Sequence, residues 1–268
     1  MGTGVPMRVG GMAFGIGVLM RGPHFWAFAR EDGTVLEGRL RTLLTRYRWL
    51  RVPVVRSLVG LVEMIGLAIF LHSRNGLARG AMLLAWLGLY VAVDFVLGLA
   101  VATYIPSLLL GNVLLGVAGI ALGLVVLRQG LGKTVWRYHG AEHKAVNAYE
   151  HGADLTDIKA VAGYSRVHDR CGTNLVVIAF VLLMLGYWPI GGLAGGELFG
   201  AVYGVLIVAI AFEFFRLVSR KPGSRVSKVV LAGGRALQRH VTTAEPEPKE
   251  LRLACVALKR VIELESGA

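Results

Sequence analysis

Three histidines and two glutamates lie within residues 137–152, RYHGAEHKAVNAYEHG. The surrounding pattern predicts a helix over 134–151, closed by Gly152. Residues three or four apart share a helix face, so His139 and His143 become neighbours and Glu142 flanks them. Two imidazoles one turn apart can bind one metal ion. The spacing H-x-x-E-H is that of inverted zinc peptidases, in which the glutamate is a general base.

A second group of possible ligands follows a short loop. The stretch SRVHDRCGTN, residues 165–174, places His168 and Cys171 in a turn just before an apolar run. We therefore expect all four side chains to lie close together at one membrane surface. A lone histidine would more simply hydrogen-bond to lipid headgroups or backbone. Four soft ligands together favour one divalent metal, with zinc as the expected ion.

Two further carboxylates could support this site. Glu150 lies on nearly the same helical stripe as Glu142, where it could be an extra ligand or a carboxylate that orients one. Glu213 lies near the end of the last apolar run. It could complete the site as a third ligand, or it could pair with Arg216 one turn away.

The composition indicates an integral membrane protein. Of the 268 residues 55% are hydrophobic and 17% are charged, whereas soluble domains carry about 25% charged residues. Each of four apolar runs approaches the roughly 20 residues that cross a bilayer: about 81–104, 107–127, 174–193 and 199–217. Lys and Arg gather in 128–173 and after residue 215. The positive-inside rule therefore places that loop and both termini in the cytoplasm.

The net charge of +12 does not indicate nucleic-acid binding, because no recognition motif accompanies it and the cations lie between apolar runs. The expected partner is the lipid bilayer, and the sequence is compatible with a homo-oligomer. The fold class is mainly α: a polytopic helical protein with about four transmembrane helices and small cytoplasmic α+β portions. We expect five divisions: a cytoplasmic Gly/Arg-rich segment at 1–52, an amphipathic helix and the first two membrane spans at 53–127, the cytoplasmic motif loop at 128–173, the last two spans at 174–218, and a cytoplasmic tail at 219–268.

Three local patterns lie outside the predicted spans. Asp32 and Gly33 form the centre of a predicted hairpin. The segment 53–73 has Arg56 and Glu63 inside it, so it is expected to be an amphipathic interfacial helix and not a span. In the tail, KELRLACVALKRVIELE predicts another amphipathic helix, with one apolar face formed by Leu251, Ala254, Cys255, Leu258 and Ile262.

The stretch YHGAEHKAVNAYEHGADLT, followed by HDRCGTN, resembles the signature of the bacterial YqhQ family. GGMAFGIGVLMRGP, PVVRSLVGLVE, FEFFRLVSRKPGS and ALQRHVTTAEP resemble its other segments, in the same order. The resemblance implies a multi-pass plasma-membrane protein that is a predicted metal-dependent enzyme. Met12 and Ile16 stand where the family usually has Gln and Glu, and Asp169 where it usually has Pro.

The leading hypothesis is a metal-dependent hydrolase at the cytoplasmic membrane face. His139, His143 and either Cys171 or His168 would hold the metal, and Glu142 would be the general base. The alternative is a non-catalytic membrane or assembly factor, because four protein ligands would close a structural site. A transporter fits less well, since only Asp94 and Glu213 are acids within predicted spans.

Overall fold

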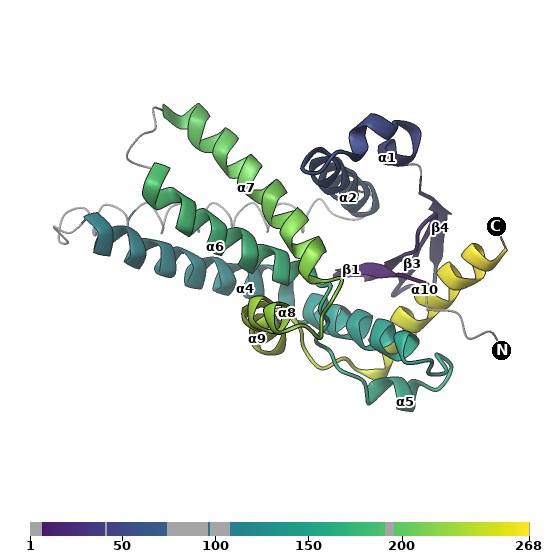
Figure 1. The fold of residues 1–268 in the computed structure, drawn as a ribbon. Helices are drawn as coiled ribbons and strands as arrows, with labels where there is room; N and C mark the ends of the chain where they lie inside the picture. The colour runs from purple at the N-terminus through teal and green to yellow at the C-terminus, as the bar shows by residue number, and fades with distance from the viewer. Residues whose placement is uncertain (1–6, 41, 74–95, 97–107, 191–195, 268) are drawn as a thin grey trace.

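The computed structural model describes residues 7–40, 42–73, 96, 108–190 and 196–267. These residues are mainly helical, with one small antiparallel sheet (Figure 1). The predicted mainly helical chain with a small α+β portion is therefore confirmed at this level.

The sheet is a four-stranded meander in the order β1-β2-β3-β4. Its strands are β1 (Gly10–Phe14), β2 (Gly17–Arg21), β3 (Phe25–Arg30) and β4 (Val35–Arg39). The predicted hairpin is confirmed as β3 and β4. At its turn Gly33 has a positive φ of 84°, and Asp32 accepts a hydrogen bond from the Thr34 amide at 2.9 Å. The pairing of β1 with β2 was not predicted.

One sheet face packs against α10 (Pro248–Ser266) and the final part of α4 (Leu108–Glu150). Figure 1 shows α10 running beside the strands. The predicted amphipathic tail helix is thus confirmed, and its buried face joins the main core. That core includes Val18, Met20, Ala27, Ala141, Ala145, Leu251, Cys255 and Leu258. Full burial of a large aliphatic side chain contributes about 1.5–3 kcal/mol to folding, so this core fixes α4 against the sheet.

Helix α4 bends before it reaches the sheet. Its segments Val117–Val126 and Arg128–Glu150 meet at 61°, and Gly132 has a positive φ of 77° within it. The Trp136 indole donates to the Arg128 carbonyl at 3.1 Å across this region. The helix ends before Gly152, which has a φ of 73°, as the glycine stop signal predicts. The bend directs the histidine-bearing part of α4 under the sheet.

The apolar start of α4 extends away from the sheet (Figure 1). So do α6 (Gly172–Ile190) and α7 (Gly196–Val218), which pack against each other. The remaining helical elements complete the fold. They are α1 (Leu43–Arg46), η1 (Arg48–Arg51), α2 (Val55–Ser73), α5 (Ile158–Ala162), α8 (Arg225–Val230), α9 (Ala232–Leu237) and η2 (Gln238–Thr242). The segment expected to be an interfacial helix is therefore helical as α2.

Among the described residues, every helix taken singly falls short of the length and apolar character needed to cross a membrane. The two bent segments 117–126 and 128–150 are long and apolar enough only when taken together, and this statement rests on length and composition alone. The apolar runs predicted at 107–127, 174–193 and 199–217 are helical where they are described. The run at 81–104 lies almost entirely outside the described residues.

Candidate metal centre

Three potential metal ligands converge where α4 meets the start of α6. The ligand atoms of His139, His143 and Cys171 all lie within 4.8 Å of one another. The Sγ atom of Cys171 is 3.3 Å from Nε2 of His139, and the two α4 imidazole rings have centroids 4.4 Å apart. The helical period brings the histidines together, and the 151–170 connection returns the chain so that the cysteine faces them.

Hydrogen bonds to backbone carbonyls fix both imidazoles. Nδ1 of His139 lies 2.6 Å from the Thr242 carbonyl oxygen, and Nδ1 of His143 lies 2.7 Å from that of Arg166. A carbonyl oxygen only accepts, so each Nδ1 must carry the proton and donate it. Each Nε2 then keeps its lone pair for another partner. This is the orientation that metal-binding histidines usually show.

Cys171 immediately precedes α6, and its sulfur contacts the first turn of that helix. The Thr173 amide donates a hydrogen bond to Sγ at 3.4 Å. The Thr173 hydroxyl oxygen lies 3.1 Å from that of Thr242. The residue that orients His139 therefore also contacts the turn that holds Cys171.

Glu142 is a buried carboxyl group beside this ligand group. Its residue is only 6% exposed. Burial raises the pKa of Glu142 above its ordinary value, and nearby His139 and His168 oppose the shift without reversing it. Its side chain packs against Gly11 of β1, where an added Cβ would lie 2.8 Å from Glu142 Cδ. A carboxyl group with a raised pKa is suited to accept and return a proton near neutral pH.

Burial also affects His143, which is 2% exposed. Burial lowers the pKa of His143, and neighbouring His139 adds to that shift. The neutral imidazole is the form that binds metal ions. Removing this part of α4 from water therefore favours the protonation state that a ligand requires.

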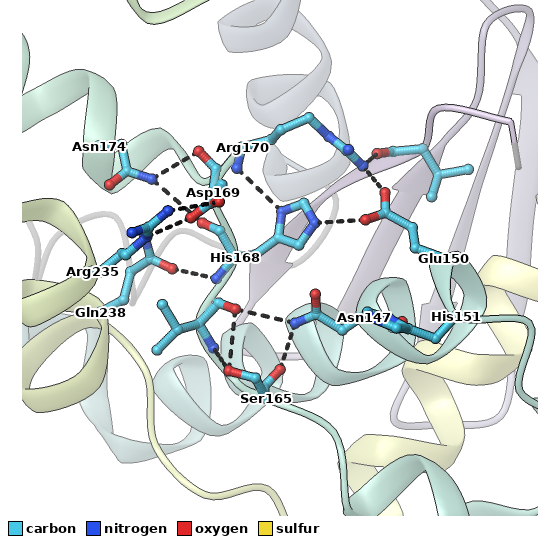
Figure 2. Close-up of polar contacts among 12 residues, drawn as sticks. Asn147, Glu150, His151, Ser165, His168, Asp169, Arg170, Asn174, Arg235 and Gln238 are labelled. Atoms are coloured by element: carbon cyan, nitrogen blue, oxygen red, sulfur yellow. Dashed lines mark hydrogen bonds and ion pairs between the residues drawn. The ribbon is translucent and has the colours of Figure 1, made fainter. Parts of the chain in front are cut away.

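His168 lies next to the ligand group but uses both ring nitrogens elsewhere (Figure 2). Its ring centroid is 5.9 Å from that of His143. Nδ1 accepts from the Arg170 amide at 3.3 Å, so Nε2 is the donor toward Glu150 at 3.3 Å. Neither nitrogen has a lone pair directed at the three-ligand group. His168 therefore lies next to the three-ligand group but is not one of its ligands.

Glu150 binds both His168 and Arg170. Its carboxylate accepts from His168 and pairs with Arg170. Burial would raise the pKa of Glu150, but these two hydrogen bonds lower it to about 2. Arg170 also donates to the Val9 carbonyl at 3.4 Å. Glu150 is therefore an anion that holds the 168–170 turn in place.

Glu213 is hydrogen-bonded to a different part of the protein. Its carboxylate accepts from the Arg56 Nε at 2.8 Å and from the Ser57 hydroxyl at 2.6 Å. These bonds join α7 to the first turn of α2. Arg56, which is distant in sequence, is thus its hydrogen-bonded partner, and Glu213 is not part of the ligand group found among the described residues.

The sequence did not point to several groups that shape the centre. The carbonyls of Thr242 and Arg166 orient the histidines through backbone atoms, which leave no signature in residue type. Two glycines could have been recognised as close-packing positions, because glycine weakens regular elements. An added Cβ at Gly140 would lie 2.1 Å from the Ala244 carbonyl oxygen, and one at Gly11 would lie 2.7 Å from that of Leu19.

Met12 and Ile16, which stand where the YqhQ family usually has Gln and Glu, lie away from the metal centre. Both side chains pack against Leu19 and Phe28. Val18 and Met20, which alternate with Leu19 along β2, belong to the core on the α4 side. Neighbouring strand residues point to opposite faces, so Met12 lies on the sheet face opposite the Glu142 contact of Gly11.

A bound metal is expected to protect Cys171 from alkylation. Its sulfur would be occupied, and zinc at 100 times its Kd should slow modification by about 100-fold if only the free form reacts. The rate is measured with N-ethylmaleimide and mass spectrometry, with and without zinc. Cys255 is the internal control: it is buried in the core, and burial raises its pKa to about 11. Equal Cys171 rates under both conditions would contradict zinc binding through this sulfur.

Comparison with known proteins gives a family but no activity. Residues 52–264 match the family described as "Protein of unknown function (DUF1385)". The chain is also 29% identical over 136 residues to the "Uncharacterized protein YqhQ" of Bacillus subtilis (strain 168), a match that covers 50% of this chain and 42% of that protein. No solved structure matches the chain. Because the family match includes most of the sequence, the chain belongs to the DUF1385 family.

Proposed function

We propose that the chain is a metal-dependent membrane protein with a hydrolase-like activity, and that His139, His143 and Cys171 bind a divalent metal, most simply zinc. Zinc bonds of about 2.0–2.3 Å require tetrahedral ligand atoms roughly 3.5 Å apart. The 3.3 Å separation of Cys171 from His139 fits this requirement. All three ligand atoms lie within 4.8 Å of one another, so no pair would need to close by more than about 1 Å to reach this spacing.

The number of available ligands carries the proposal. Three side chains converge, while the fourth candidate, His168, has both ring nitrogens hydrogen-bonded to Arg170 and Glu150. A structural zinc site normally has four protein ligands, whereas a catalytic site keeps one position for water or substrate. Three ligands therefore favour catalysis over the structural alternative.

Glu142 would supply the proton transfer. A metal at this position would provide Lewis acidity for the attack of water on a polarised bond. The Glu142 carboxylate would accept the proton of that water and return it to the leaving group. Its burial near His139 and His168, with a raised pKa, supports this assignment.

The proposed location is the cytoplasmic face of a bacterial plasma membrane, with the apolar α4 start, α6 and α7 within the bilayer. The support is the concentration of Lys and Arg in 128–173 and after residue 215. The ligand group lies where the apolar helices meet the sheet, so the centre would face the aqueous side of that boundary.

His168→Ala is expected to leave one metal per chain, whereas Cys171→Ala should lose most of it. The reason is that only Cys171 contributes to the three-ligand group. Metal content of the purified proteins, with zinc X-ray absorption spectra to count sulfur and nitrogen neighbours, gives the result. Removal of a nitrogen neighbour in His168→Ala would make His168 a fourth ligand and would favour the structural alternative.

A further inference from the structure

An exposed apolar surface precedes α2. Trp49 is 71% exposed, and Leu43, Tyr47 and Val52 are also exposed. Large apolar side chains exposed together are uncommon on soluble surfaces and often mark a site of interaction. Trp and Tyr are also the residues that gather at the interface between membrane and water. We call residues 43–52 the Trp49 surface.

The same ten residues are strongly basic. Arg46, Arg48 and Arg51 lie between the apolar side chains, and the sequence from Thr42 to Ser57 contains no Asp or Glu. The Arg46 guanidinium lies 5.3 Å from the Tyr47 ring centroid. Arg51 donates to the Leu44 carbonyl at 2.8 Å, while Arg48 is exposed. Aromatic rings interleaved with arginines match a surface that is anionic outside and apolar beneath.

An ion pair sets the position of this surface relative to the apolar helices. Arg56 and Ser57, in the first turn of α2, hydrogen-bond to Glu213, five positions before α7 ends at Val218. Figure 1 shows α2 beside the part of α7 nearest the sheet, with α1 on the side of α2 away from α7. If α7 leaves the bilayer at its C-terminal end, the Trp49 surface lies at that same level.

We infer that the Trp49 surface binds the anionic headgroup layer of the membrane, with Trp49 at the boundary of the acyl chains and Arg46 and Arg48 at lipid phosphates. This inference rests on the membrane placement proposed above and is independent of the metal. It also gives α2 a function: the helix would hold the N-terminal sheet, and thereby Gly11 and Glu142, at a fixed distance from the bilayer.

The test uses the full chain reconstituted in vesicles of phosphatidylcholine brominated on its acyl chains, with or without phosphatidylglycerol brominated in the same way. The Trp49 signal is the fluorescence of the parent protein minus that of Trp49→Phe. We expect the brominated chains to quench this signal, and to do so more strongly when phosphatidylglycerol is present. Added salt should reduce the difference between the two lipids, because it screens exposed charges.

The variant Arg46→Gln/Arg48→Gln tests the role of charge and leaves Arg51, which bonds Leu44, in place. Each basic residue near an anionic surface contributes about 1 kcal/mol, so the ratio of docked to free Trp49 should fall about fivefold for each arginine removed. The matched control is Lys159→Gln/Arg252→Gln, which removes two exposed cations on α5 and α10 and should not change the signal.

Three results would overturn the inference. If the brominated chains do not quench Trp49 fluorescence, the Trp49 surface does not bind the membrane, although the proposed membrane placement of the protein would still stand. Equal quenching in both lipids, unchanged in the arginine variant, would remove the anionic component. Recovery of the protein apart from the vesicles would overturn the placement and this inference together. Metal content should stay at the parent level in every variant, so failure here would not count against the metal centre.

Discussion

Glu142→Gln is expected to keep its metal and lose function. Glutamine has nearly the same shape as glutamate but cannot accept the proton, and general-base catalysis contributes about 10²–10⁴-fold to rate. The ligand group of His139, His143 and Cys171 stays complete in this variant. Complementation of a strain that lacks the gene, together with metal content of the purified protein, measures both properties.

His143→Ala and Glu263→Gln are the matched comparisons. The first removes a ligand and should lose metal and function together. The second makes the same chemical change at an exposed position of α10 and should complement fully. If Glu142→Gln complements as well as the parent protein at equal expression, Glu142 is not the general base. The metal would then have a structural role, and its ligands would connect α4 to the start of α6.

The part of the centre that lies within one helix could be predicted from the sequence. The helical period alone makes His139 and His143 neighbours, and the short connection to 165–174 limits how far Cys171 can be. The state of His168 could not be predicted in this way. The direction of its ring depends on the Arg170 amide and on the charge of Glu150, and both depend on how a turn folds against α4.

Contacts between segments far apart in the sequence could not be predicted from local sequence patterns. Thr242 reaches His139 from 103 positions away, and Arg56 reaches Glu213 from 157 positions away. The strands β1 and β2 were missed because glycines interrupt their alternation. Gly17 is one of them: an added Cβ would lie 2.1 Å from the Ala29 carbonyl oxygen. The glycine that lets β2 approach β3 closely at this position therefore also hides β2 from a search for alternating apolar residues.

The connection between α9 and α10 is expected to control the metal centre through Gly140. The Ala244 amide donates to the Trp136 carbonyl at 2.9 Å, so this segment crosses α4 in direct contact. A Cβ at position 140 would lie 2.1 Å from the Ala244 carbonyl oxygen, and the segment would have to move away. Thr242, two residues earlier, orients His139. Displacing it would leave the His139 ring without a fixed direction.

Gly140→Ala should therefore weaken metal binding by about 10–100-fold, which is the usual effect of losing a group that orients a ligand. Overpacking should also lower the free energy of unfolding by about 1–3 kcal/mol, although alanine in a helix normally adds up to about 1 kcal/mol. Competition with a zinc chelator measures the affinity, and thermal unfolding without metal measures the stability.

Gly60→Ala is the matched control for Gly140→Ala. Gly60 is also helical, in α2, but a Cβ there meets nothing within 4 Å. Its metal affinity should equal that of the parent protein, and its stability should be equal or slightly higher. Parent-like zinc affinity in both alanine variants would mean that the Thr242 contact does not orient His139. Weaker binding in Gly140→Ala alone would instead show that a main-chain contact from the C-terminal tail determines how the α4 histidine binds its metal.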